Sequence, residues 1–208
     1  MDLDLTEDQE AIRDVFADFF TSETGPERAR AAEPVGFDAA AWERLMETGA
    51  PGMGVDADLG GGGASLADLA VVAEEAGARI APLPLVDHQV TARLLASVGG
   101  CDDDVLSGAA IAGLAVRPVE DGTARTVPTG AVTGRLVALD GDRLIAVDGP
   151  PGDPLANHGC LPLAHREVSE ATVLAKGPEA IAAYDRALDE WRTLTASTLV
   201  GITRTALD

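Results

Sequence analysis

The sequence predicts an α+β multidomain protein: an N-terminal all-α helical domain, a small antiparallel β sheet or barrel domain, and a long helix that starts a C-terminal helical bundle. Two changes of hydrophobic period carry this prediction. Apolar residues recur every three or four positions at first, alternate in short runs through the middle, and return to helical spacing near the end. We place the three parts at residues 1–105, 106–175 and 176–208.

Two helices are expected in the first fifty residues. Thr6 followed by Gln9 is a capping-box pattern and predicts an amphipathic helix over residues 6–21. After a polar stretch, a second helix begins at Asp38, with Trp42 on its buried face, and ends before a glycine that suits the residue after a helix.

Two more helices complete the expected N-terminal unit. The glycine-rich residues 50–65 predict a loop, because glycine disfavours regular helix. Ser65 then caps a third helix, with Asp68 at the reciprocal position, and prolines stop it. A fourth helix is expected over residues 86–98, so these helices form a compact all-α unit.

The middle of the chain reads as strands. Its segments are short, rich in Val, Ile, Leu and Thr, and separated by turn sequences. The expected strands are 109–117, 124–127, 133–139, 142–148 and 165–173. Residues 139–143, with an Asp-Gly pair, are the clearest hairpin signal.

The chain closes with a predicted helix over residues 178–208. Pro178 suits the first turn, and apolar residues then form a stripe. The stripe comprises Ile181, Tyr184, Leu188, Trp191, Leu194, Leu199 and Ile202. No further helix follows to cover it. We therefore expect that the rest of a helical bundle is missing, and that this segment mediates association of the 208-residue chain.

Composition excludes several classes of function. Thirty-five acidic residues against fifteen basic ones would repel nucleic-acid phosphates, so no nucleic-acid partner is expected. No apolar run is long enough to span a membrane, the acidic start is unlike a signal peptide, and Cys101 and Cys160 are too isolated for a disulfide framework. We expect a cytoplasmic protein.

Other candidate sites are weaker. The run Gly60–Gly63 is not preceded by a strand or followed by the residues of a phosphate-binding loop, so we interpret it as a loop between helices. His88, His158 and His165 are dispersed and lack metal-ligand spacing, so no metal site is expected.

In order and spacing, several segments resemble the acyl-CoA dehydrogenase family. These are LTEDQEAIRDVFADFF, FDAAAWERLMETGAPGMGV, SLADLAVVAEEAGARIAPLPLV, and more loosely TVPTGAVTGRLVAL, PLAHREV and LVGITRTALD. The resemblance spans the chain but only part of the family's length. It implies FAD as cofactor, an acyl-CoA thioester as substrate, homo- or hetero-oligomers of related subunits, and an electron-transfer flavoprotein as a partner. The family's catalytic glutamate belongs to the C-terminal bundle, so no catalytic residue is expected here.

The resemblance also implies which residues face the flavin. The family's Thr-Glu-Pro-like turn after the first strand corresponds to Val116 and Arg117, followed by a proline. A second flavin-side strand corresponds to Val127, Pro128 and Thr129. These five are the expected cofactor-binding residues. Val116 lacks the hydroxyl of the family's threonine, and proline lacks both a hydroxyl and an N–H.

Thr129 could supply a hydroxyl in place of the one that Pro128 lacks. Arg117 could stabilise a reduced flavin or a pyrophosphate, and the alternative is a strand-end arginine paired with Glu120 or Asp121.

Three functions compete at this stage. The first is a flavin-dependent acyl-CoA dehydrogenase whose catalytic base lies outside this chain. The second is a non-catalytic subunit of the same type, which assembles with a competent partner. The third, an independent small binding module, is disfavoured because the last helix would expose its apolar stripe.

Overall fold

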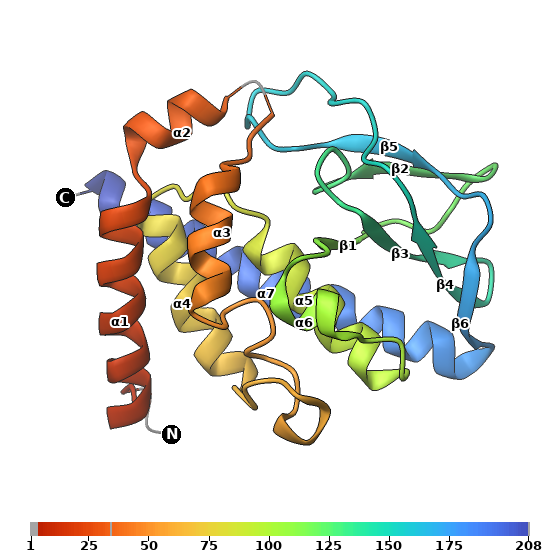
Figure 1. The fold of residues 1–208 in the computed structure, drawn as a ribbon, viewed down its shortest axis with the longest axis horizontal. Coiled ribbons are helices and arrows are strands. Elements are labelled where there is room, and N and C mark those ends of the chain that lie inside the picture. The colour runs from red at the N-terminus through yellow and green to blue at the C-terminus, as the bar shows by residue number, and fades with distance from the viewer. Residues whose placement is uncertain (1–3, 34, 208) are drawn as a thin grey trace.

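Residues 4–33 and 35–207 are described by the computed structural model, whose N-terminal half is helical (Figure 1). Its helices are α1 (Glu7–Glu23), α2 (Pro26–Ala32), α3 (Ala39–Glu47), α4 (Leu66–Ala78), α5 (Leu85–Ser97) and α6 (Asp103–Ser107), with the 3-10 turn η1 (Ala57–Leu59) in the glycine-rich loop. The four helices expected from sequence correspond to α1, α3, α4 and α5.

Local capping explains where these helices begin. The Thr6 side chain accepts the Gln9 N–H, and the Gln9 side chain accepts the Thr6 N–H, so the expected capping box is confirmed. Ser65 and Asp68 form a second capping box at the start of α4. Asp68 also accepts a hydrogen bond of 3.0 Å from Gln9 Nε2, which ties α1 to α4.

Two short helices, α2 and α6, lie outside the helices expected from sequence. At the start of α2, Gly25 has a φ of 129° and leads into Pro26 at the first helical position, where the missing proline N–H costs no hydrogen bond. The Asp38 carboxylate then accepts from Arg28 Nε at 2.7 Å and anchors α2 to the start of α3. Helix α2 could not be predicted from hydrophobic spacing, because its sequence is mostly polar and only its last residue, Ala32, is buried.

The strands form two small sheets. They are β1 (Ala112–Leu114), β2 (Thr123–Val127), β3 (Arg135–Asp140), β4 (Arg143–Asp148), β5 (Ala164–Glu167) and β6 (Thr172–Lys176). One sheet has the order β1-β3-β4-β6 and the other pairs β2 with β5. All pairs are antiparallel except β1 with β3, which is parallel. The expected strand 165–173 is divided between β5 and β6, which belong to different sheets.

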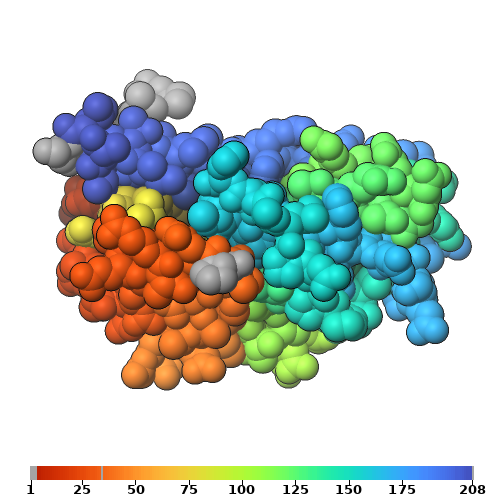
Figure 2. Space-filling model, turned by 90° about the horizontal axis from the view of Figure 1, so that it is seen from above, coloured from red at the N-terminus to blue at the C-terminus, as the bar shows by residue number. Residues whose placement is uncertain are grey.

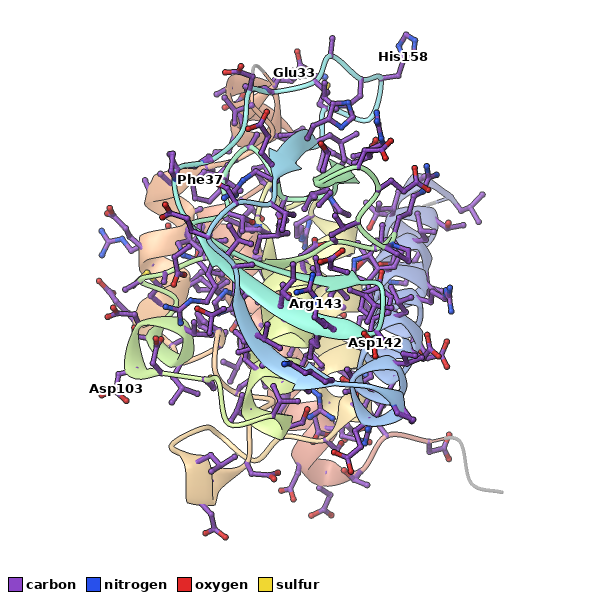
Figure 3. All side chains as sticks on the ribbon, turned by 90° about the vertical axis from the view of Figure 1, so that its right-hand side faces the viewer. Glu33, Phe37, Asp103, Asp142, Arg143 and His158 are labelled. Atoms are coloured by element: carbon purple, nitrogen blue, oxygen red, sulfur yellow. The ribbon has the colours of Figure 1, made fainter. Side chains whose placement is uncertain are left out.

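The expected hairpin at residues 139–143 is confirmed. Asp140 pairs with Arg143 across a two-residue turn, and Gly141 takes a φ of 62° that favours glycine. Asp142 and Arg143 mark the tip of this hairpin in Figure 3. The Gly177 N–H donates to the Asp142 carbonyl at 2.7 Å, so the tip is tied to the residue before α7.

Helix α7 (Pro178–Leu207) crosses behind both halves of the molecule (Figure 1). It packs on α4, α5 and the four-stranded sheet, and the Tyr184 hydroxyl donates to the Ala115 carbonyl at 2.7 Å. A Cβ atom at Gly77 of α4 or Gly201 of α7 would collide with the carbonyl oxygen of the opposite helix, at Thr198 and Glu74 respectively. The two helices therefore approach through glycines.

The packing of α7 differs in part from the expectation that its stripe is uncovered. Tyr184, Leu188 and Leu194 are buried within this chain, whereas Leu199 and Ile202 remain 56% and 38% exposed. Hydrophobic spacing did not reveal the partner, because the closest contact with α4 is made by glycines. None of the described helices is long and apolar enough to cross a membrane.

Candidate functional site

A groove of about 550 Å³ lies between the helices and the loop that precedes β5. Its walls come from α2, the end of α4, the α4–α5 connection, the start of α5, Pro128 and Thr129, residues 159–162, and one face of α7. Figure 2 looks onto the face where α2 (orange), the loop before β5 (cyan) and the C-terminal part of α7 (blue) meet. Glu33, which lines the groove, and His158, beside residues 159–162, lie at the same end of the molecule (Figure 3).

One face of α7 forms a long wall of the groove. Trp191, Thr195, Thr198 and Ile202 line it, and their spacing of three or four places them on one side of a helix. The Thr198 hydroxyl is used within the helix, where it donates to the Leu194 carbonyl at 3.1 Å. The Thr195 hydroxyl makes no hydrogen bond within the described residues, so it can bind a ligand.

The groove contains a carboxylate held by an indole. Asp87 lies in the first turn of α5, and its Oδ1 accepts a hydrogen bond of 2.9 Å from Trp191 Nε1 of α7. Burial raises the pKa of Asp87 to about 6, although the Trp191 hydrogen bond and its own backbone N–H act to lower it. Asp87 makes no ion pair with any described residue. The groove therefore holds an acid that forms no ion pair with the described residues, although Arg30 lines the same groove.

Three of the expected cofactor-binding residues lie at or beneath the groove. Pro128 and Thr129 line it, and Val127 is fully buried in the sheet core directly before them. Thr129 is 2% exposed, and its hydroxyl oxygen accepts from the Thr133 hydroxyl at 2.9 Å. Each of the two hydroxyls thus has a partner inside the protein.

The other two expected residues are elsewhere. Val116 packs against the main hydrophobic core, and Arg117 is exposed; neither lines the groove. No ion pair among the described residues involves Arg117, and Glu120 instead lies 4.0 Å from Arg125 Nε. The structure therefore brings Val127, Pro128 and Thr129 together but leaves Val116 and Arg117 outside the groove.

His88, the neighbour of Asp87, has a structural role. It is fully buried, with Nε2 3.0 Å from the Val105 carbonyl and Nδ1 accepting from the Ala112 N–H. These contacts select the neutral tautomer with a proton on Nε2, and burial lowers the pKa of His88 to about 4. No group of metal-ligating side chains is found in the described part of the chain.

The sequence prediction missed Asp87 and Trp191 as a pair. Trp191 was assigned only to the apolar stripe, and Asp87 was not singled out. A usable signal was present, because an acid inside the apolar segment PLVDHQV requires a compensating partner. The identity of that partner could not be read from spacing, since it lies 104 residues away.

The N-terminal half of the chain matches a known domain. Residues 6–100 match the profile described as acyl-CoA dehydrogenase, N-terminal domain. The chain is 31% identical over 149 residues to acyl-CoA dehydrogenase IpdE2 of Mycolicibacterium smegmatis, covering 69% of this chain and 46% of that protein. The chain thus spans less than half the length of this relative.

Solved structures share the fold over nearly the whole chain. The Tcur3481-Tcur3483 steroid ACAD G363A variant superposes with a TM-score of 0.82 at 24% identity, covering 97% of this chain and 64% of that one. The ChsE4-ChsE5 complex from Mycobacterium tuberculosis superposes with a TM-score of 0.77 at 21% identity, covering 100% of this chain and 65% of that one. At these identities the similarity concerns the fold.

Proposed function

Since this chain belongs to the acyl-CoA dehydrogenase family, we propose that it is part of an enzyme that desaturates an acyl-CoA thioester between its α and β carbons, with FAD as electron acceptor. The chain spans less than half of the IpdE2 relative. We place the catalytic base outside it, as the family resemblance implies.

The observation that carries this proposal is the groove. It is lined mainly by apolar side chains and runs between the helices and the turn after β2, where the resemblance places the flavin-side residues. Ligand sites are typically apolar clefts with a few polar groups that fix orientation. Here the polar groups include Asp87 and Thr195, with Arg30 and Glu33 lining the groove from the α2 side, and the apolar wall includes Pro84, Leu85 and Ile202.

The residues present fit only part of a flavin. The apolar surface at Pro128 suits a flat ring, but this side of the groove offers few accessible donors to the ring's polar edge. Pro128 has no N–H, and Thr129, whose hydroxyl accepts from Thr133, is 2% exposed. We therefore assign no reaction step to FAD in this chain.

This chain's own residues bind and shield the substrate. The apolar wall removes the acyl carbons from water, and α7 closes one side of the groove. The close glycine contacts of α7 with α4 keep that wall in place. Exclusion of water matters because a carboxylate base is more effective at an α-proton when it is not hydrated.

One observation favours the second candidate, a non-catalytic subunit that assembles with a competent partner. The burial of Thr129 and the missing N–H of Pro128 leave the β-sheet side with few accessible donors. One structural neighbour, the ChsE4-ChsE5 complex, is named as an assembly of two different chains. In such an assembly this chain would contribute fold and acyl-binding surface while its partner holds the flavin.

Flavin absorbance of the purified full-length gene product tests the proposal, alone and after co-expression with any dehydrogenase-like protein encoded beside it. A yellow protein that bleaches when an acyl-CoA is added supports the enzyme. A colourless protein that cannot be reconstituted with FAD, alone or with the partner, contradicts it. Flavin found only on the partner's chain selects the second candidate.

A further inference from the structure

We propose that Asp87 makes the groove selective for acyl groups that carry a hydroxyl, which donates a hydrogen bond to the carboxylate oxygen that Trp191 leaves free. The inference rests on the proposed function, because it takes the groove to hold the acyl part of a thioester. It adds the chemical class of that acyl part.

Two elements fix the carboxylate in place. Asp87 is in the first turn of α5, and the indole N–H that binds its Oδ1 comes from the middle of α7. Trp191 itself packs against the main hydrophobic core, which limits its movement. The carboxylate is therefore a preorganised acceptor, which favours recognition of a donor at one position in the groove.

The second carboxylate oxygen has no partner in another residue of the described part of the chain, although the backbone N–H of Asp87 itself also contacts the carboxylate. No side chain other than Trp191 donates to Asp87 within the described residues, and no cation pairs with it. Burial already raises the pKa of this acid, and a bound acyl group would remove more water from it. An aliphatic chain would thus leave an acceptor unsatisfied, which weakens its binding relative to a chain that carries a donor.

A hydroxyl on the acyl group removes that penalty. Its O–H can donate to the free Asp87 oxygen, and hydrogen bonds to a charged acceptor are the stronger kind. The Thr195 hydroxyl, one helical turn beyond Trp191 on the same wall, can donate to or accept from the same ligand group. Pro84 and Val86 beside Asp87 are apolar, as are most of the other lining residues apart from Arg30 and Glu33, so a carbon skeleton fits next to the polar pair.

The test uses two series of CoA thioesters on the full-length protein with any co-encoded partner. One series contains straight acyl chains from butanoyl to decanoyl, and the other contains the same chains with a terminal hydroxyl. Binding is measured by titration calorimetry, which does not require turnover. We expect at least one hydroxylated chain to bind about tenfold to a hundredfold more tightly than its plain counterpart.

Two substitutions assign that preference to Asp87. Asp87→Asn keeps the size and an oxygen for Trp191 but presents an NH₂ group in place of the free acceptor, so the preference should fall below about threefold. Asp87→Leu should favour the plain chains. Asp189→Asn is the matched control, because Asp189 is an exposed carboxylate on the same helix as Trp191, and it should leave the preference intact.

The outcomes separate the inference from the function on which it rests. Equal affinity for plain and hydroxylated chains at every length overturns the inference and leaves the dehydrogenase proposal standing. So does a preference that Asp87→Asn retains. If no thioester of either series binds and the same sample shows no flavin absorbance, the proposed function fails and the inference fails with it.

Discussion

The two walls of the groove differ in what they offer a ligand. On the helical wall, Asp87 presents an oxygen with no partner in another residue, and Thr195 presents a free hydroxyl. On the β-sheet wall, Thr129 is 2% exposed, with its hydroxyl accepting from Thr133, and Pro128 has no N–H to give. Polar groups on a wall recognise a ligand only if the ligand can reach them. This chain therefore recognises from its helices, and its sheet supplies surface.

The helical wall depends on the contact between α4 and α7. Of the substitutions that we propose, Gly201→Ala should disrupt this contact and lower the free energy of unfolding the most. A new Cβ would collide with the Glu74 carbonyl, which belongs to backbone and cannot move aside cheaply. We expect the free energy of unfolding to fall by about 3 kcal/mol, measured by chemical denaturation. In an uncrowded helix the same change would be stabilising.

Gly134→Ala is the control on the sheet side. No atom lies within 4 Å of a Cβ at Gly134, and its φ is not in the left-handed region. Its effect should stay within about 0.5 kcal/mol. If both variants unfold at the same denaturant concentration as the wild type, the close packing of α4 against α7 is wrong.

Asp87 and His88, which are adjacent in α5, should each make the free energy of unfolding depend on pH. Burial raises the pKa of Asp87 from 3.8 to about 6, so the folded state binds that proton more tightly and loses stability as pH rises from about 4 to 6. Burial lowers the pKa of His88 from 6.5 to about 4, so its contribution is lost as pH falls through that range. The two effects oppose each other in the wild type.

Asp87→Asn should remove the opposing contribution of Asp87 and leave the pH dependence due to His88. Between pH 6.5 and 4, the free energy of unfolding of the variant should fall by about 2 kcal/mol more than that of the wild type. Denaturant titrations at a series of pH values measure this difference. Parallel pH curves for the two proteins would mean that the surroundings of Asp87 do not raise its pKa.

The β-sheet wall can be given additional donors at residue 128. Pro128→Thr supplies a backbone N–H and a hydroxyl at a position that lines the groove. Under the proposed function it should tighten FAD binding by about tenfold, the value of one to two net hydrogen bonds. Equilibrium dialysis of the full-length protein against FAD measures this. An unchanged or weakened affinity would place the flavin's polar edge away from Pro128.

The smallest effect on stability is expected at the exposed end of α7. Leu199 is 56% exposed, so Leu199→Glu should change the free energy of unfolding by no more than about 0.5 kcal/mol. The same substitution should weaken the association expected of residues 178–208, because it places a charge on an apolar surface. Light scattering of the 208-residue chain tests this; a wild type that is strictly monomeric contradicts the expectation.

Much of the fold could be predicted because its signals are local. The capping boxes at Thr6 and Ser65 lie within one helical turn of their partners, and the hairpin around Gly141 joins adjacent strands. The parallel pairing of β1 with β3 could not be predicted, nor could the division of residues 165–173 between two sheets. Both depend on where distant strands lie in space, and strand composition does not report this.

At the candidate site, too, part could be predicted from the sequence and part could not. The resemblance led to Pro128 and Thr129, which do line the groove, and to Val116 and Arg117, which do not. It could not show that the Thr133 hydroxyl donates to Thr129 or that Thr129 is buried, because a sequence does not report which side chains meet or how exposed they are.

By itself, the sequence determined the succession of a helical part, a β part and a final helix, the family and the acidic character of this protein, since period, capping and composition act over short distances. Only the tertiary structure decided that α7 packs on α4 and that Trp191 meets Asp87 across 104 residues. The packing of α7 on α4 depends on Gly77 and Gly201, whose role is visible only where the two helix backbones meet. The contact of Trp191 with Asp87 depends on that packing, which turns one face of α7 toward the start of α5 and leaves a groove between them.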